Sequence, residues 1–258
     1  MSNEDKKNLN NHSENEHSFK SLKAKPVVIK DNMRYFYRNP FFLIIQILIC
    51  VFIRFFINFL LGKLIFGLKI KNKKVLRQVH KKGTITIANH AFIFDSLILG
   101  STTYPWKITY VTMLKENMGI VFVGKFLRLI GGVPIPDKLN QIKKFNQGLK
   151  KEINKCHNVC VFAEASLKPY CNHIRNFMPG AFRFVYDTNA YILPAVFIFK
   201  RPRGWYRLVR GKKPTIQLHY LEPIKFQEYA TKHETITKMQ ELVQAKMTNY
   251  FNENNEVF

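Results

Sequence analysis

Strand-like and helix-like runs alternate along most of the chain, and this alternation restricts the possible folds more than any other sequence feature. From residue 83 onward, β-branched and aromatic runs follow amphipathic stretches, with no internal repeat or linker between them. The expected strands are 84–87, 107–113, 133–135, 159–162, 192–199 and 216–221, and the expected helices are 95–103, 119–129, 139–155, 180–188 and 233–251. The alternation predicts an α/β domain with a mainly parallel sheet flanked by helices.

The first quarter of the chain differs from the rest in composition. Residues 1–25 are rich in Asn, Lys, Glu, Ser and His and almost lack apolar side chains, so they cannot offset the entropy lost on ordering. We predict three parts: a disordered polar tail over 1–25, a basic and apolar membrane-attachment segment over 26–75, and one globular domain over 76–258. The length of 258 residues suits a single domain core.

The most apolar stretch is Phe41–Leu61, which reads FFLIIQILICVFIRFFINFLL. As a helix rising about 1.5 Å per residue, it is long enough to cross a hydrocarbon core of about 30 Å. Its polar residues Gln46, Arg54 and Asn58 fall within an arc of about 120°. This arc favours an interfacial or re-entrant helix that packs one side on protein, and a single crossing with a snorkelling arginine is the alternative.

The chain is strongly basic, with 41 Lys and Arg against 17 Asp and Glu and a formal charge of +24. No acidic residue occurs between Asp31 and Asp95, so bases alone flank the apolar stretch. This pattern predicts attachment to the cytoplasmic face of the cell membrane, with anionic phospholipid as a partner. Nucleic acid is the weaker alternative and not an expected partner, because no zinc-finger spacing or Gly-x-x-Gly clamp accompanies the charge.

A second basic stretch, residues 200–213, surrounds Trp205 and Tyr206 between two expected strands. Aromatic residues among bases suit the headgroup layer of a membrane, so we predict a second membrane contact here, with a solvated hairpin as the alternative.

The cysteines indicate neither disulfides nor a metal. The N-terminal residues show no secretory leader pattern, which favours a reduced, cytosol-facing protein. Cys156, Cys160, Cys171 and His173 carry suitable zinc ligands, but their spacing matches no common zinc site. We therefore expect no metal and no cofactor.

His90 and Asp95 stand directly after the expected strand 84–87, in the pattern Asn-His-x4-Asp. Loops that follow parallel strands are where α/β sheets place functional residues. At this spacing an Asp carboxylate can return onto the imidazole, set its tautomer and stabilise it once protonated. Such a base would activate a substrate hydroxyl without a Ser or Cys nucleophile. The alternative is that both residues merely cap a helix.

Further motif blocks follow in order, and together they identify a family. They are Lys115-Glu116, Gly131–Ile135, Phe162–Ser166 and Leu193–Ala195. Over about residues 80–225, the combination resembles the 1-acylglycerol-3-phosphate O-acyltransferase (lysophosphatidate acyltransferase) family. The resemblance implies a glycerolipid acyltransferase-like fold. It also implies transfer of a fatty acyl group from acyl-CoA or acyl carrier protein to the free hydroxyl of a lysophosphatidate-like acceptor, in phospholipid biosynthesis.

The resemblance also implies roles for individual residues. His90 is the general base and Asp95 its polarising partner; the implied substrate-binding residues are Asn89, Lys115, Lys138, Glu164, Ser166 and Arg175. Leu193–Ala195 is expected to be mainly a packing block.

The chain departs from the family pattern in two blocks. Asp137 stands where the second block usually has arginine, and the third block has Leu167 at its usual arginine position. Lys138 and Arg175 are the candidate replacements, with Arg175 near a helix start at Gly180 that favours an anion. The departures keep two alternatives open: another lysophospholipid or glycerol phosphate as acceptor, or a catalytically impaired lipid-binding membrane protein.

Overall fold

A seven-stranded sheet forms the centre of the computed structural model, which describes residues 27–36 and 39–256. The strands are β1 (Lys69–Lys71), β2 (Thr84–Ala88), β3 (Thr109–Met113), β4 (Gly132–Pro134), β5 (Asn158–Phe162), β6 (Tyr191–Lys200) and β7 (Thr215–Tyr220). Their order is β1-β7-β6-β2-β5-β3-β4, and every pairing is parallel except β6–β7. The mainly parallel α/β sheet is therefore confirmed, while the tail predicted over 1–25 lies outside the described residues.

The predicted helices are present, with additions that were too short to show a period. The helical elements are α2 (Pro40–Ile53), η1 (Arg54–Phe66), α3 (Val75–Gln78), α4 (Asp95–Thr102), η2 (Lys115–Gly119), α5 (Val123–Leu129), α6 (Leu139–Asn154), α7 (Pro179–Thr188), α8 (Trp205–Arg210) and α9 (Lys232–Asn254). The helix expected over 119–129 starts only at Val123, because Phe122 has a φ of 61° that a right-handed helix does not allow.

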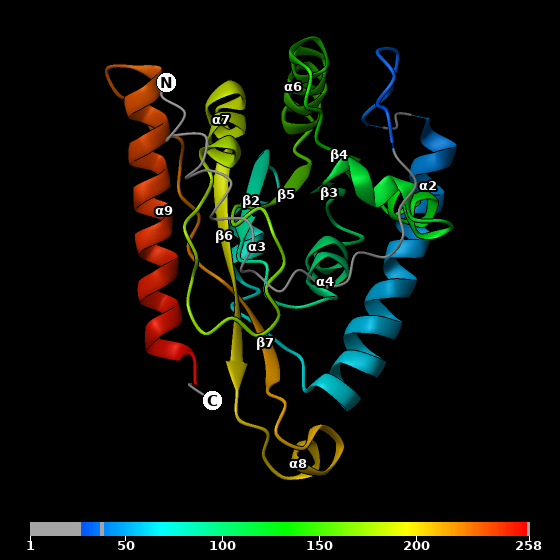
Figure 1. Cartoon of the computed structure of the whole chain (residues 1–258), viewed down its shortest axis with the longest axis vertical. Coiled ribbons are helices and arrows are strands. Elements are labelled where there is room, and N and C mark those ends of the chain that lie inside the picture. The colour runs from blue at the N-terminus through cyan, green and yellow to red at the C-terminus, as the bar shows by residue number, and fades with distance from the viewer. Residues whose placement is uncertain (1–26, 37–38, 257–258) are drawn as a thin grey trace, which may run out of the picture.

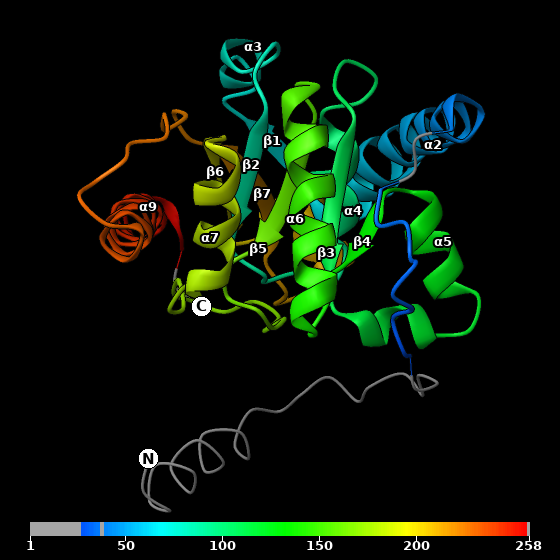
Figure 2. The same ribbon diagram turned by 90° about the horizontal axis from the view of Figure 1, so that it is seen from above.

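Both faces of the sheet are covered, and each has its own apolar core. Along β6, Ile192, Val196 and Ile198 join the core under α6, α7 and α9, whereas Leu193 and Phe197 join the core under α4. This alternation is the period of a strand buried on both sides. Figures 1 and 2 show α9 along one edge of the molecule and the long helix α2–η1 along the opposite edge.

Residues 27–36, at the start of the predicted membrane-attachment segment, pack against the folded domain. Tyr35 packs edge-on against Phe145 at a ring-centroid distance of 5.4 Å, and Phe36 packs against Tyr110 at 5.1 Å. The Arg128 guanidinium donates to the Tyr35 carbonyl at 2.9 Å. Likewise β1 already pairs with β7, so the boundary predicted at residue 76 falls inside the folded unit.

The helix α2–η1 binds the domain through its polar face. Gln46 donates to the Tyr104 hydroxyl at 2.7 Å, Arg54 donates to the Tyr104 carbonyl, and Asn58 donates to the Ser101 hydroxyl at 3.0 Å. The opposite face exposes large apolar side chains: Phe41, Ile44, Leu48, Phe52, Phe55 and Phe59. By length and composition the continuous helix Pro40–Phe66 can span a membrane. Gln46, Arg54 and Asn58 nevertheless all contact protein, which is the packing that their common arc predicts.

Candidate active site

Most of the predicted site residues, but not Lys115 and Lys138, gather where β2 and β5 end. These two strands are parallel neighbours, paired from Thr84↔Asn158 to Ala88↔Phe162, so the loops that follow them meet at one edge of the sheet. His90 lies in the first loop and Ser166 in the second. The carboxyl edge of a parallel sheet is where such folds place ligands.

His90 and Asp95 form the expected dyad. His90 Nδ1 and Asp95 Oδ2 are 2.7 Å apart, and the Asp95 side chain is fully buried. The same carboxylate oxygen accepts the backbone amides of Ala91 at 3.1 Å and Phe92 at 3.2 Å, which fixes it at the start of α4. With Nδ1 engaged by a carboxylate, Nε2 is the ring nitrogen available to accept a proton from substrate.

The imidazole lies at the edge of an open cleft. The His90 ring stacks on Phe162, with a centroid distance of 4.3 Å and an interplanar angle of 25°. Its side chain is 21% exposed and lines a cleft of about 790 Å³ together with Ser96, Ser166 and Lys168. The cleft therefore leaves room for a substrate next to the imidazole.

Glu164 and Arg175 support the His90 loop from beneath. The buried Glu164 carboxylate accepts the His90 backbone amide at 3.1 Å, the Arg175 backbone amide at 2.9 Å and the Arg175 guanidinium at 2.9 Å. The same guanidinium donates to the Ser166 hydroxyl at 2.8 Å. Of these three predicted substrate-binding residues, only Ser166 lines the cleft. Glu164 and Arg175 bond each other, and Glu164 also bonds the His90 backbone.

The Asn89 side chain bonds the neighbouring strand β6. Its side chain donates to the Phe197 carbonyl at 3.1 Å and accepts the Phe197 amide at 2.7 Å. These two bonds extend the pairing of β2 with β6 past the last backbone pair, Ala88↔Ala195. Asn89 thereby fixes the residue next to His90.

The expected phosphate-binding lysines lie outside this cleft. Lys115, in η2, donates to Asp137, the residue at the usual arginine position of the second block. This hydrogen bond raises the pKa of Lys115 and lowers the pKa of Asp137. Lys138 precedes α6 on the surface. Lys168 instead brings a cation to the cleft, and its place directly after Leu167 is the sequence signal that could have identified it.

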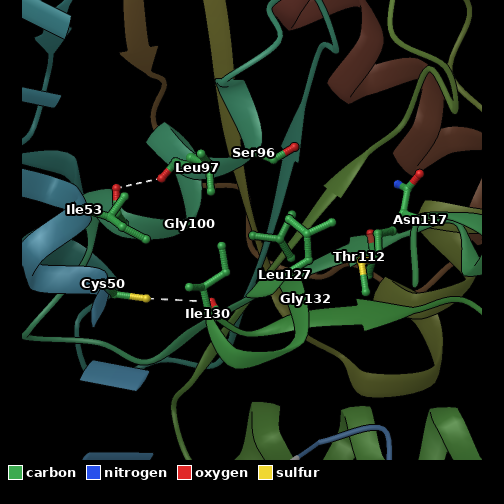
Figure 3. A pocket seen from close by; sticks show the side chains of 13 residues that line it. Cys50, Ile53, Ser96, Leu97, Gly100, Thr112, Asn117, Leu127, Ile130 and Gly132 are labelled. Atoms are coloured by element: carbon green, nitrogen blue, oxygen red, sulfur yellow. Dashed lines mark hydrogen bonds between the residues drawn. The ribbon is translucent and has the colours of Figure 1, made fainter. Parts of the chain in front are cut away.

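A small apolar pocket continues from the cleft towards α2 (Figure 3). It has a volume of about 70 Å³ and shares Ser96, Thr112, Met113 and Asn117 with the cleft. Its far wall is formed by Cys50 and Ile53 of α2 and by Ile130. The pocket therefore lies between the cleft that His90 lines and the helix with the exposed apolar face.

The described residues form no group of three His, Cys, Asp or Glu side chains that could hold a metal ion. The site combines a histidine–carboxylate dyad, an open cleft and a small apolar pocket, an arrangement suited to base-assisted acyl transfer.

Comparisons with known proteins agree with this class. A family model for acyltransferases matches residues 67–198, just over half of the 258 residues, so the chain belongs to the acyltransferase family. No curated protein matches the sequence. Among solved structures, the 1-acyl-sn-glycerophosphate (LPA) acyltransferase PlsC from Thermotoga maritima is similar in fold. Its TM-score is 0.50 at 17% identity, over 72% of this chain and 71% of that chain. The predicted family and its fold are confirmed.

Proposed function

We propose that the protein transfers a fatty acyl group from an acyl-CoA or acyl carrier protein thioester to the free hydroxyl of a lysophosphatidate-like acceptor. The observation that carries this proposal is the 2.7 Å contact of His90 with the buried Asp95, at the edge of a cleft of about 790 Å³. The family membership supports acyl transfer, and the acceptor and donor are our inference.

The chemistry follows from the geometry of the dyad. The acceptor hydroxyl attacks the thioester carbonyl carbon while His90 Nε2 takes the hydroxyl proton. Asp95 stabilises the imidazolium that forms. The tetrahedral intermediate then collapses, the carbon–sulfur bond breaks, and the leaving thiolate takes the proton from His90. The products are an ester and a free thiol, so protons and electrons balance without a metal or redox step.

The phosphate of the acceptor is assigned to Lys168, because this lysine lines the same cleft as His90. The apolar pocket behind Ser96 suits the start of an acyl chain. The Lys115–Asp137 pair favours a second candidate function, in which the acceptor is another lysophospholipid or glycerol phosphate, because that pairing occupies a cation expected to meet phosphate.

An acceptor screen tests the proposal. Purified protein in detergent receives labelled acyl-CoA or acyl carrier protein thioester with lysophosphatidate, other lysophospholipids or glycerol 3-phosphate, and products are identified by mass. We expect acylated lysophosphatidate, and we expect His90→Ala to lower kcat by about 10²–10⁴-fold or more. His233→Ala, at an exposed histidine on α9, is the matched control and should retain activity. No product from any acceptor would refute the proposal.

A further inference from the structure

A second cavity lies at the opposite end of the sheet from His90. It has a volume of about 520 Å³ and is lined by Thr84 and Asn158, the first residues of β2 and β5. At about 3.3 Å per residue, the five residues of β2 separate its two ends by about 13 Å. The cavity is therefore distinct from the catalytic cleft, with which it shares no lining residue.

This cavity, here called the basic pocket, is lined by four Lys and Arg side chains and one histidine from three elements. Arg54 enters from η1, Lys73, Arg77 and His80 come from α3 and its flanks, and Lys107 comes from the segment after α4. No Asp or Glu lines it, and within residues 27–36 and 39–256 no acidic side chain forms an ion pair with any of these five.

The positive charge in the basic pocket is partly desolvated. Lys107 is only 8% exposed, and its ammonium donates to the backbone carbonyls of Val79, at 2.8 Å, and Lys82. Burial lowers the pKa of Lys107 to about 8, and burial followed by the charge of Arg54 lowers the pKa of Lys73. Removing cations from water next to one another costs free energy, and a bound anion would offset that cost.

The surroundings of the pocket indicate the source of the anion. Arg54 reaches it from the helix whose outer face exposes Phe52 and Phe55, and Trp106, at its rim, is 73% exposed. Tryptophan is enriched in the headgroup layer of membranes. Leu76 and Leu193 add apolar wall next to the cations. A phosphate group attached to a glycerolipid matches this combination better than a free ion does.

We propose that the basic pocket binds the phosphate group of an anionic glycerophospholipid, at a site separate from the catalytic cleft. The phosphate oxygens meet Lys73, Arg77 and the free face of the Lys107 ammonium, and the glycerol meets the apolar wall. The bound lipid would anchor the domain beside α2–η1 and is not consumed in the reaction.

Trp106 provides a direct probe, because the chain contains only two tryptophans. In the full chain carrying Trp205→Phe, nonionic micelles doped with phosphatidylglycerol are titrated at fixed ionic strength while Trp106 fluorescence is recorded. Micelles doped with phosphatidylcholine, and inorganic phosphate without lipid, form the other two arms. We expect a saturable change with phosphatidylglycerol and none with phosphatidylcholine.

Variants that remove the same charge inside and outside the basic pocket distinguish binding at the pocket from general attraction of the basic protein to anionic lipid. Lys73→Gln with Arg77→Gln should weaken phosphatidylglycerol binding about tenfold or more, since each loses a charge-assisted contact. Lys74→Gln with Lys81→Gln removes the same charge from exposed neighbours outside the pocket and should change binding by about twofold or less. Circular dichroism checks the fold, and the single variants Lys73→Gln and Arg77→Gln replace the pair if it misfolds.

Three results would overturn the proposal: equal losses in the two variant pairs, an equal response to phosphatidylcholine, or saturation by inorganic phosphate with no response to lipid. The last result would assign the pocket to phosphate from solution. Because none of these readouts needs turnover, failure here is distinguishable from failure of the proposed acyl transfer.

Discussion

Two cations of the third motif region have different roles in the structure. The Arg175 guanidinium bonds Glu164 and Ser166 below the His90 loop, whereas Lys168 lines the open cleft. From the sequence, Arg175 was the expected phosphate ligand. Its engagement by a buried carboxylate makes it a support for the loop, because a guanidinium taken from this carboxylate would leave an unpaired buried charge.

Because of these roles, substitution of Arg175 should mainly affect stability, and substitution of Lys168 should mainly affect acceptor binding. Arg175→Met should lower the free energy of unfolding by about 3 kcal/mol, because Glu164 loses its buried partner. Lys168→Met should change stability by less than about 0.5 kcal/mol and raise KM for a phosphate-bearing acceptor about tenfold. Urea unfolding and steady-state kinetics measure the two quantities. A stable Arg175→Met protein with a raised KM would instead identify Arg175 as a phosphate ligand and not as a support for the His90 loop.

The lowered pKa of His219, on β7, predicts how the free energy of unfolding depends on pH. Burial, with added repulsion from Lys71 and Lys200, lowers the pKa of His219 to about 4, against about 6.5 for an unfolded histidine. Between these values the unfolded chain binds a proton that the folded chain does not, so stability falls as pH falls from about 6.5 to 4. The Tyr250 hydroxyl lies 2.9 Å from His219 Nδ1.

His219→Gln should remove about 2–3 kcal/mol of this pH dependence, because glutamine stays neutral. Unfolding free energies at pH 7 and pH 4.5 provide the test. His233→Gln, on the surface, should keep the wild-type slope, and an identical slope in all three proteins would exclude His219 as the cause.

At the scale of elements, the long helix α2–η1 joins an apolar outer face to a polar inner face. Its inner side chains bond α4 and the segment after it through Ser101 and Tyr104, so the helix is part of the domain. The outer aromatic rings stack on one another, Phe52 on Phe56 and Phe55 on Phe59, and are the expected contact with the bilayer.

Replacing outer aromatic residues tests the orientation of α2–η1. Phe55→Asn with Phe59→Asn should reduce partitioning into zwitterionic vesicles about tenfold or more, since each exposed ring loses apolar burial in the interface. The fold should survive, because both side chains are exposed. Leu242→Asn, at a half-exposed leucine of α9, is the control and should not alter flotation with vesicles. Unchanged flotation of the double variant would place the membrane elsewhere.

The sequence predicts elements that depend on local pattern and misses those that depend on distant partners. His90 and Asp95 are five positions apart, so the geometry of the dyad follows from one turn. The periodic helices and strands can likewise be recognised from their own residues. By contrast, the Asn89–Phe197 clamp joins residues 108 apart, and the Glu164–Arg175 pair depends on how an irregular loop folds back. Strand β1 is recognised only by its pairing with β7.

At the scale of the whole molecule, the charge of +24 and the apolar helix predict two components of membrane binding. Binding to anionic vesicles should weaken as salt rises, because screening reduces attraction between surface charges. Binding to zwitterionic vesicles should be almost independent of salt, because it depends on buried apolar area. Flotation at about 0.1 M and about 1 M salt, where the Debye length falls from about 10 Å to about 3 Å, distinguishes them. Complete release at high salt would exclude the apolar component.

The short helix α4 has a geometric consequence. It begins at Asp95 and ends beside the residues that bind α2–η1, and its eight residues span about 12 Å. In the proposed reaction, this helix of fixed length would separate the His90 imidazole from the face of α2–η1 that we expect to contact the bilayer. The fold would then set the depth at which acyl transfer occurs, and we expect acceptors to be selected by how far the hydroxyl rises above the lipid tails as well as by their chemistry.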